Sequence, residues 1–310
     1  MNRRDLLLRG GSALALLSTP FVAAAEPDRD WTVRDGRDGK PIRWRDLPGR
    51  LATANVIFLG EQHDDPETHR VEAALLEAMH RKVGARLTLA MEMLERDGQA
   101  TLDDYLAGKI DETAFAKARR LWPDYATDYR PLVEYAKTNR VPVLASNAPR
   151  KLVARVGKEG LAAALADMTA QERAQIAASV LAPEGDAYAA RFAAIIGQGH
   201  GDGKAMDAPT VRRFYEAQCV RDDTMAETVA GAVRAGRVVL HVNGSFHSDA
   251  GLGTAARVLW RCPLDARIAT VKIVPYKNKF EWEPLRGEAD YLIFVPDRRV
   301  PAPPDASEPE

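Results

Sequence analysis

The stretch from Val56 to Asp65 constrains this fold more than any other part of the sequence. Its four apolar residues, Val56–Leu59, have the length and β-branching of a strand that is buried on both faces. The run stops at Gly60, and the polar residues Glu61 and His63 follow at once. Because side chains alternate along extended backbone, these two residues are expected to point to the same side. The pattern predicts a buried strand that ends in a polar elbow.

A helix is predicted directly after this elbow. Asp65 has the character of an N-cap, Pro66 that of a first helical residue, and Glu67 places an acid in the first turn. His69 lies off the apolar stripe, so we predict that it is solvent-exposed and a second-rank site candidate. The stripe follows the i, i+3, i+4, i+7, i+8 spacing of one buried helix face: Val71, Ala74, Leu75, Ala78 and Met79.

Several further apolar runs predict a sheet, and three of them also end in polar residues. Strands are expected over residues 86–93, 141–147 and 237–243, which end at Glu92, at Asn147 and at an elbow containing His247. Two more are expected at 268–275 and 291–296. The sequence therefore predicts an α/β fold with a mostly parallel central sheet flanked by helices. The residues that follow Gly98, up to Asn139, are interpreted as a helical insertion, and residues 26–297 as one domain.

The termini are predicted to lie outside this domain. Residues 1–25 contain the pair Arg3-Arg4, a short apolar stretch and the small residues 23–25, which together are typical of a twin-arginine signal peptide. The alternative is a membrane anchor, but the apolar stretch is too short to span a bilayer comfortably. We therefore expect an exported, periplasmic protein without stable membrane insertion after signal removal. The Pro- and acid-rich residues 298–310 are expected to be disordered.

The net charge bears on possible binding partners, and the cysteine content bears on disulfide pairing. The formal net charge of −1 gives no whole-molecule field that would attract nucleic acid, so no nucleic-acid partner is expected. The two cysteines, Cys219 and Cys262, would be permitted to pair in an oxidising compartment. Cys219 could equally be a packed helix residue, and the sequence leaves both alternatives open.

A long predicted helix, residues 211–233, carries polar residues on its apolar stripe. Gln218 and Asp222 interrupt the stripe, and Arg221 borders it. Buried polar groups need hydrogen-bond partners, and a functional site is one place where such partners occur. The alternative is an amphipathic helix whose boundary residues are solvated. We retain Arg221 and Asp222 as candidate catalytic residues.

The strand ends supply a coherent set of chemical groups. Glu61, His63, Glu92 and His247 combine carboxylates with imidazoles, which suits either a divalent-metal site or acid–base catalysis. The H-E-x-x-H, G-x-S-x-G and P-loop motifs are absent from the sequence, so the common helix-borne zinc site and the serine-hydrolase elbow are not indicated. Trp122, with Tyr125 and Tyr129, would either line a slot for a planar ligand or simply pack the insertion.

Five stretches in order resemble the ChaN-type haem-binding uptake proteins of the Tiki superfamily. They are residues 60–64 (GEQHD), 92–108 (EMLERDGQ and the following L and YLAG), 141–150 (VPVLASNAPR), 217–226 (AQCVRDDTMA) and 243–247 (NGSFH). The resemblance implies an α/β core with a helical insertion, haem as ligand, a role in iron acquisition, and homodimers that hold haem between subunits. Many relatives are lipoproteins, whereas this sequence has no cysteine near its signal cleavage site. The resemblance to that group therefore leaves outer-membrane anchoring unsupported.

The resemblance is compatible with two functions, haem binding and hydrolysis. As a haem-binding protein the chain needs an apolar slot, a base for the propionates and an iron ligand, for which Tyr129, His200 and Met206 are candidates. The superfamily also resembles erythromycin esterases and proposed metal-dependent proteases, whose motif residues carry over to Glu61, His63, Glu92 and His247. A hydrolase would use His63 as general base, oriented by Glu61 or Glu92 or assisted by a divalent metal. A scaffold with neither activity is the third alternative. We expect haem binding.

Overall fold

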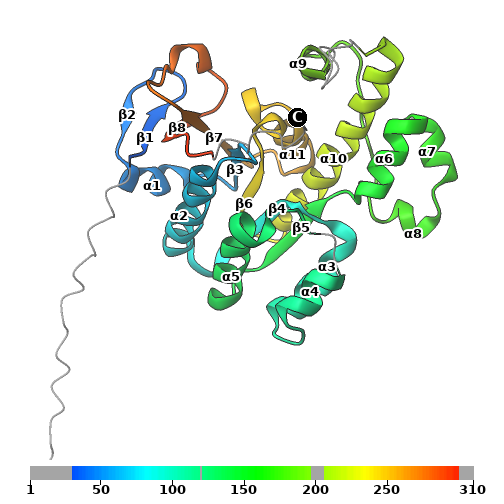
Figure 1. Cartoon of the computed structure of the whole chain (residues 1–310), viewed down its shortest axis with the longest axis horizontal. Helices are drawn as coiled ribbons and strands as arrows, with labels where there is room; N and C mark the ends of the chain where they lie inside the picture. Colours follow the sequence, from blue (N-terminus) through cyan, green and yellow to red (C-terminus); the bar gives the residue numbers. More distant parts are fainter. Residues whose placement is uncertain (1–29, 119–120, 197–205, 300–310) are drawn as a thin grey trace, which may run out of the picture. The chain divides into compact units, whose positions relative to one another are not determined.

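A single sheet organises the described part of the chain, which comprises residues 30–118, 121–196 and 206–299 of a computed structural model. These residues form an eight-stranded sheet of order β2-β1-β8-β7-β3-β6-β4-β5 (Figure 1). The strands are β1 (Thr32–Asp35), β2 (Pro41–Ile42), β3 (Val56–Glu61), β4 (Leu87–Glu95), β5 (Val143–Asn147), β6 (Val238–Gly244), β7 (Ile268–Tyr276) and β8 (Tyr291–Pro296).

The centre of this sheet is parallel and its edge is antiparallel. Strand β3 pairs in parallel with β6 and β7, and β4 pairs in parallel with β6 and β5. Strand β1 is antiparallel to both β2 and β8. The short loop between β1 and β2 can only return the chain antiparallel, because a parallel pair needs a long crossover. The predicted α/β fold is confirmed, and its mostly parallel sheet becomes a mixed sheet at this edge.

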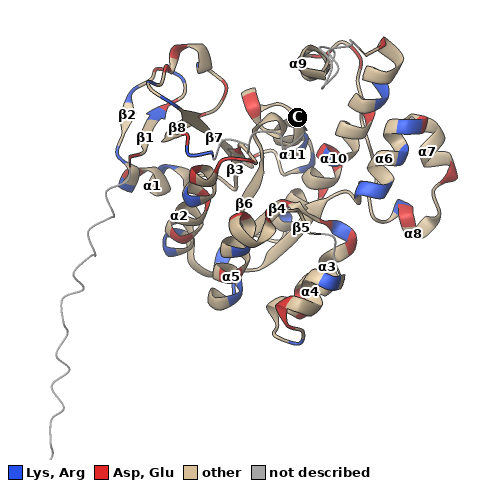
Figure 2. Cartoon of the chain, in the orientation of Figure 1, with Lys and Arg blue, Asp and Glu red and all other residues tan. Residues whose placement is uncertain are grey.

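Helices cover both faces of the central strands, which explains the fully apolar strand β3. Ile57 and Leu59 point into a cluster that includes Leu75 and Met79 of α2 (Pro66–Val83). The alternate residues of β3 pack on the other face, against α10 (Ala208–Arg234) and α11 (Gly253–Arg261). Figure 2 shows the charged residues on the helices and loops, while the central strands are largely uncharged.

Two long connections carry the remaining helices. Between β4 and β5 lie α3 (Gln99–Leu106), α4 (Glu112–Ala118), a π-helical turn (Tyr125–Tyr129) and α5 (Arg130–Asn139). Between β5 and α10 lie α6 (Arg150–Glu159), α7 (Leu161–Asp167), α8 (Ala170–Arg173) and α9 (Ala187–Ile196). The short α1 (Leu47–Leu51) precedes β3. Single 3-10 turns cover Trp44–Asp46, Gly84–Arg86, Arg96–Gly98, Ser245–His247, Asp249–Gly251 and Glu283–Leu285.

Within the described ranges, none of the helices combines the length and the apolar character needed to cross a bilayer. The predicted signal peptide and most of the predicted tail lie outside the described residues.

Candidate functional site

The candidate site lies at the carboxyl ends of β3, β6 and β4, which are neighbours in the sheet. Glu61 is the last residue of β3 and pairs in register with Gly244, the last residue of β6. His247 follows in the next turn. Glu92 belongs to β4, whose register against β5 shifts just beyond Met91. Such irregularities re-aim side chains near sites, and here Glu92 reaches the same end as Glu61 and His247.

His63 is oriented by a carboxylate from the preceding strand. Its Nδ1 contacts Oε1 of Glu61, and the hydroxyl of Tyr129 donates a hydrogen bond to the same oxygen at 2.9 Å. The ring of His63 lies edge-on to Trp122 with 4.9 Å between centroids. The His63 side chain is 42% exposed, whereas Glu61 is buried. The elbow therefore presents one accessible imidazole whose inner nitrogen is held in place.

Electrostatics around this pair favour its charged forms. Burial lowers the pKa of His63, but the hydrogen bond to Glu61 and the charges of Glu92 and Glu61 outweigh it, so the pKa is raised. Burial raises the pKa of Glu61, but hydrogen bonds from Glu72 and His63 reverse this effect, and its pKa is lowered. An ionised Glu61 consequently faces His63 at neutral pH.

The second histidine is enclosed by two carboxylates. His247 Nδ1 lies 2.7 Å from Asp222 Oδ1, and its Nε2 lies 3.2 Å from Glu92 Oε1. Burial lowers the pKa of His247, yet the charges of Glu92 and Asp222 raise it to about 10. Thr254 and Tyr188 donate to the two oxygens of Asp222 at 2.7 Å each. His247 is therefore a buried imidazolium with both ring nitrogens engaged.

The backbone at Gly244 passes close to the side chains of His63 and Glu92. A Cβ atom on Gly244 would lie 2.6 Å from Nε2 of His63 and 3.6 Å from Oε2 of Glu92. The Gly244 amide also donates to Glu92 Oε2 at 2.8 Å. Glycine at this position therefore lets the end of β6 pass directly beside the imidazole.

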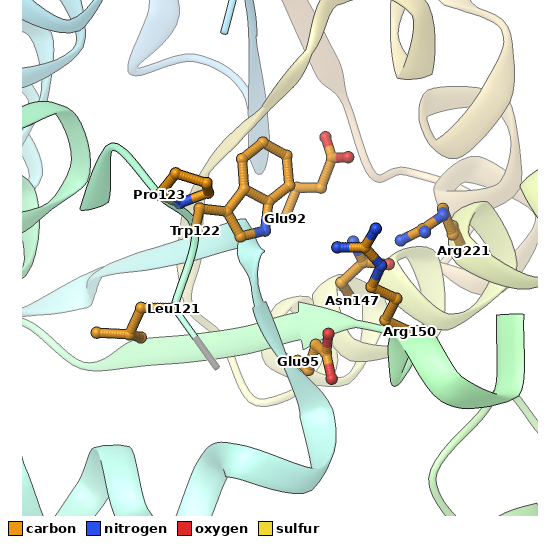
Figure 3. Close-up of a pocket in the computed structure, with 8 residues that line it drawn as sticks. All are labelled: Glu92, Glu95, Leu121, Trp122, Pro123, Asn147, Arg150 and Arg221. Carbon is orange, nitrogen blue, oxygen red and sulfur yellow. The ribbon is translucent and has the colours of Figure 1, made fainter. Parts of the chain in front are cut away.

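A cavity of about 460 Å³ opens beside this cluster (Figure 3). Leu121, Trp122 and Pro123 provide an apolar side, and the indole of Trp122 lies next to Glu92. The volume is within the range of roughly 300–1,000 Å³ that is usual for small-molecule sites. The remaining lining residues are polar or charged: Glu92, Glu95, Asn147, Arg150 and Arg221.

Two guanidinium groups face this cavity and have no partner in the described part of the chain. Arg150 and Arg221 lie on the same side, next to Asn147 (Figure 3). No hydrogen bond or ion pair joins either of them to another described residue. Burial lowers the pKa of Arg221, with opposing contributions from the charges of Glu92 and Glu95. Guanidinium groups bind carboxylate or phosphate in a bidentate manner, so this side of the cavity suits an anionic ligand.

The same arginines also border a second cavity, of about 440 Å³, between α6 and α10. Its walls are mainly small or apolar and include Val153, Gly157 and Phe214. Phe214 is 37% exposed, so its ring adds accessible aromatic surface to this cavity. A ligand that contacts Arg150 and Arg221 therefore meets apolar surface on both sides of them.

The prediction for His69 was wrong, because the side chain is buried. Its ring packs edge-on against Tyr129 with 4.9 Å between centroids, and its Nδ1 lies 3.0 Å from Oε2 of Glu72. The apolar stripe of the helix alone could not reveal that His69 is buried, because Tyr129, which covers it, belongs to the helical insertion. Burial and the charge of Glu61 raise the pKa of Glu72 well above its ordinary value.

The structure brings Glu61, His63, Glu92, His247, Asp222 and Arg221 to one end of the sheet, together with Tyr129. The candidate ligand Met206 lies elsewhere. Met206 precedes α10, and from Ala208 to Asp222 that helix rises about 21 Å at roughly 1.5 Å per residue. His200 lies outside the described residues. Cys219 and Cys262 are both free, so they are not paired.

Sequence reasoning missed two residues as ligand-binding candidates. Asn147 ends β5 and Arg150 begins α6, so both occupy a strand end of the same kind as Glu61. The first polar residues after each parallel strand would have been the signal to follow. Tyr188, which donates to Asp222, could not have been found in this way because α9 is distant in sequence and packs there only in the folded chain.

Comparisons with known proteins identify the family and the fold. The family described as "Haem-binding uptake, Tiki superfamily, ChaN" matches residues 47–258. The structure resembles ChaN of Campylobacter jejuni, described with cofacial haem binding, at a TM-score of 0.65 and 17% identity, over 86% of this chain and 97% of that one. An erythromycin esterase, EreC, matches at a TM-score of 0.45 and 12% identity, over 79% and 77%.

A curated relative comes from a plant. The chain is 23% identical over 276 residues to Protein RETICULATA-RELATED 5, chloroplastic, of Arabidopsis thaliana, a match that covers 84% of this chain and 36% of that protein. The chain thus spans little more than a third of its length. The family match, by contrast, takes in most of the described residues and every strand end of the site. This chain belongs to the ChaN family of haem-binding uptake proteins in the Tiki superfamily.

Proposed function

We propose that this protein binds haem in the cavity beside His63, as an exported component of haem or iron uptake. The observation that carries the proposal is the pairing of an apolar wall at Trp122 with the guanidinium groups of Arg150 and Arg221, which have no hydrogen-bond or ion-pair partner among the described residues. Haem presents the matching surfaces, because its macrocycle is apolar and planar and its propionates are carboxylates. The residues present therefore fit the group that the family binds.

We further propose His63 as the iron ligand. Histidine is a common haem ligand, and metal-bound histidines usually donate their other nitrogen to a carboxylate, as His63 does to Glu61. Tyr129 is less suited in this arrangement. Its hydroxyl is committed to Glu61, and burial, together with the charges of Glu61 and Glu72, raises the pKa of the phenol far above its ordinary value. It would thus stay protonated, whereas a tyrosine ligand must ionise.

Titration of the purified protein with haemin and with iron-free protoporphyrin tests both parts of the proposal. We expect haemin to give a shifted Soret band. Arg150→Gln and Arg221→Gln should each lower the affinity for haemin and for protoporphyrin about 10-fold, as expected for a lost charged hydrogen bond. His63→Ala should lower the affinity for haemin and shift the Soret band of the bound haemin. It should leave the affinity for protoporphyrin unchanged. Arg45→Gln is the matched control, since Arg45 is exposed and lies outside the cavity.

The outcomes separate clearly. Haemin that produces no Soret shift with the wild-type protein would contradict haem binding itself. Haemin binding that is equally strong in the Arg150, Arg221 and Arg45 variants would move the ligand away from this cavity. An unchanged Soret band in His63→Ala would remove His63 as the iron ligand while leaving the cavity in place.

Hydrolysis is the second candidate function, favoured by the half-exposed His63 oriented by Glu61 beside the imidazolium of His247. In such a reaction His63, when neutral, would take a proton from water or an alcohol, and the nearby positive charges would stabilise an oxyanion. A panel of esters tests this with His63→Ala as the comparison. Hydrolysis that persists in this variant would rule out the mechanism.

A further inference from the structure

We propose that Glu61, His69 and Glu72 form a buried site for one divalent transition-metal ion, which would tie β3 to the first turns of α2 behind the haem cavity. The proposal does not depend on haem binding. Glu61 ends β3, and the other two residues lie one turn apart on α2. One ligand atom from each of the three lies within 4.8 Å of the others, and all three side chains are buried.

The tautomer of His69 points to a cation. Its Nε2 lies 3.2 Å from the backbone carbonyl oxygen of His63, which can only accept a hydrogen bond, so Nε2 carries the hydrogen. In the neutral ring the Nδ1 lone pair then faces Oε2 of Glu72 at 3.0 Å and Oε2 of Glu61 at 3.5 Å. Three electron-pair donors converge here, an arrangement that requires either protons or a metal ion between them.

Two carboxylate oxygens at this point are reached by no donor from outside the pair. Oε2 of Glu61 and Oε1 of Glu72 are buried, and among the described residues only a proton shared between the two carboxyl groups would satisfy them in the absence of an ion. Only histidine nitrogens lie within ion-pairing distance of either carboxylate in the described part of the chain. Among the described residues, no lysine or arginine therefore neutralises this pair, and a metal ion would supply the positive charge that buried carboxylates normally meet.

The donor set and its surroundings match those of metal sites. One imidazole and two carboxylates suit Zn²⁺, Fe²⁺ or Mn²⁺. Metal-bound histidines and carboxylates are usually held by an outer layer of hydrogen bonds. Here Nε2 of His69 faces the His63 carbonyl and, at 3.6 Å, Asp128, while Tyr129 donates to the other oxygen of Glu61.

An ion at this position would act on the proposed haem cavity through its ligands Glu61 and His69, which both contact His63. It would hold the carboxylate whose other oxygen orients His63, so it is a positioning element and not a reaction centre. Because all three donors are buried, we expect the ion to be acquired as the chain folds and not by diffusion into the finished structure.

Metal analysis of the full chain, refolded with Zn²⁺ or Co²⁺ and then passed through a chelating resin, tests the site. We expect about one retained ion per chain, a Co²⁺ absorption spectrum, and a melting temperature raised by roughly 5 °C or more over the chain refolded with EDTA. Glu72→Gln and His69→Gln should lose both the ion and the metal-dependent shift. Glu77→Gln, an exposed change on the same helix, should retain them.

The result that overturns the proposal is wild-type protein that retains no ion and melts identically with and without metal. This measurement needs no variant, so it stands even where Glu72→Gln fails to fold. Retention of the ion by both site variants would equally place it elsewhere. A haemin titration of the same samples separates this outcome from the haem proposal, because the cavity arginines are not metal donors.

Discussion

At the scale of single residues, environment decides the chemistry of otherwise similar side chains. His247 and His241 are both buried imidazoles near the same strand end, yet their protonation differs. Burial lowers the pKa of His241 to about 4, and its hydrogen-bond partners among the described residues, Ser146 and Asn243, are neutral. His247 is instead held between the carboxylates of Glu92 and Asp222, which raise its pKa to about 10. Sequence proximity could not distinguish these cases.

Asp222→Asn should strongly destabilise the protein. The change leaves a buried imidazolium with one carboxylate, and breaking a buried ion pair typically costs about 3–5 kcal/mol. Urea unfolding measures the free-energy difference. Asp104→Asn is the matched control, because its ion pair with Lys109 is exposed to solvent and should contribute little to stability. Equal effects of the two substitutions would contradict the buried ion pair.

The pKa of His247 also predicts a pH dependence of stability. Because the folded-state pKa is about 10 and the ordinary value is 6.5, folding takes up a proton between these values. The contribution of His247 is therefore complete below about pH 6.5 and is lost as the pH rises through about 10. In ¹⁵N-detected NMR titrations we expect His247 to stay doubly protonated from pH 5.5 to 8.5, while His241 stays neutral. A His247 titration near pH 6.5 would refute this.

At the scale of elements, the elbow after β3 shows what local sequence can specify. The run Val56–Leu59, the N-cap Asp65 and the helix stripe correctly predicted strand and helix, and Asp65 accepts from the Thr68 amide at 2.9 Å. The same stripe wrongly placed His69 in solvent. Periodicity describes one helix and its own face, whereas burial of His69 is due to Tyr129, which lies on a different element.

Gly244→Ala should disturb the site while preserving the fold. The added Cβ would lie 2.6 Å from Nε2 of His63, so the imidazole must move. We expect haemin affinity to fall about 10-fold or more, measured by Soret titration. Gly231→Ala in α10 is the matched control, with its nearest neighbour 3.9 Å away at the end of an arginine side chain. It should leave affinity unchanged and slightly stabilise the helix. Unchanged affinity in Gly244→Ala would contradict the close approach.

At the scale of the whole molecule, the cavity proposed to bind haem is assembled from segments far apart in sequence. Glu92 comes from β4, Trp122 from the connection before β5, Arg150 from α6 and Arg221 from α10. Each segment could be assigned a structure locally, but only the order β3-β6-β4-β5 brings their ends to one place. Family resemblance predicted haem as ligand, and the tertiary structure supplies a cavity in which that proposal can be tested.

Export belongs to this scale as well and remains a prediction from residues 1–25. Replacing Arg3 and Arg4 by lysine should retain the full-length precursor in the cytoplasm, because the twin-arginine pair is read by a receptor as an address. Cell fractionation with immunoblotting measures this. Replacement of Arg9 by lysine is the control and should leave export intact. Equal periplasmic amounts of the double variant and the wild type would contradict twin-arginine export.

The sequence by itself determined what is encoded by short-range periodicity and by local caps. It determined the strand that begins with Val56–Leu59, the helix that follows, and the acids and imidazoles placed at strand ends, because these depend on neighbouring residues. The tertiary structure alone decided that His247 is charged, that His69 is buried against Glu72, and that Arg150 and Arg221 line the same cavity. Each of these properties depends on the charges and walls that distant segments bring, and such contacts form only when the sheet has assembled.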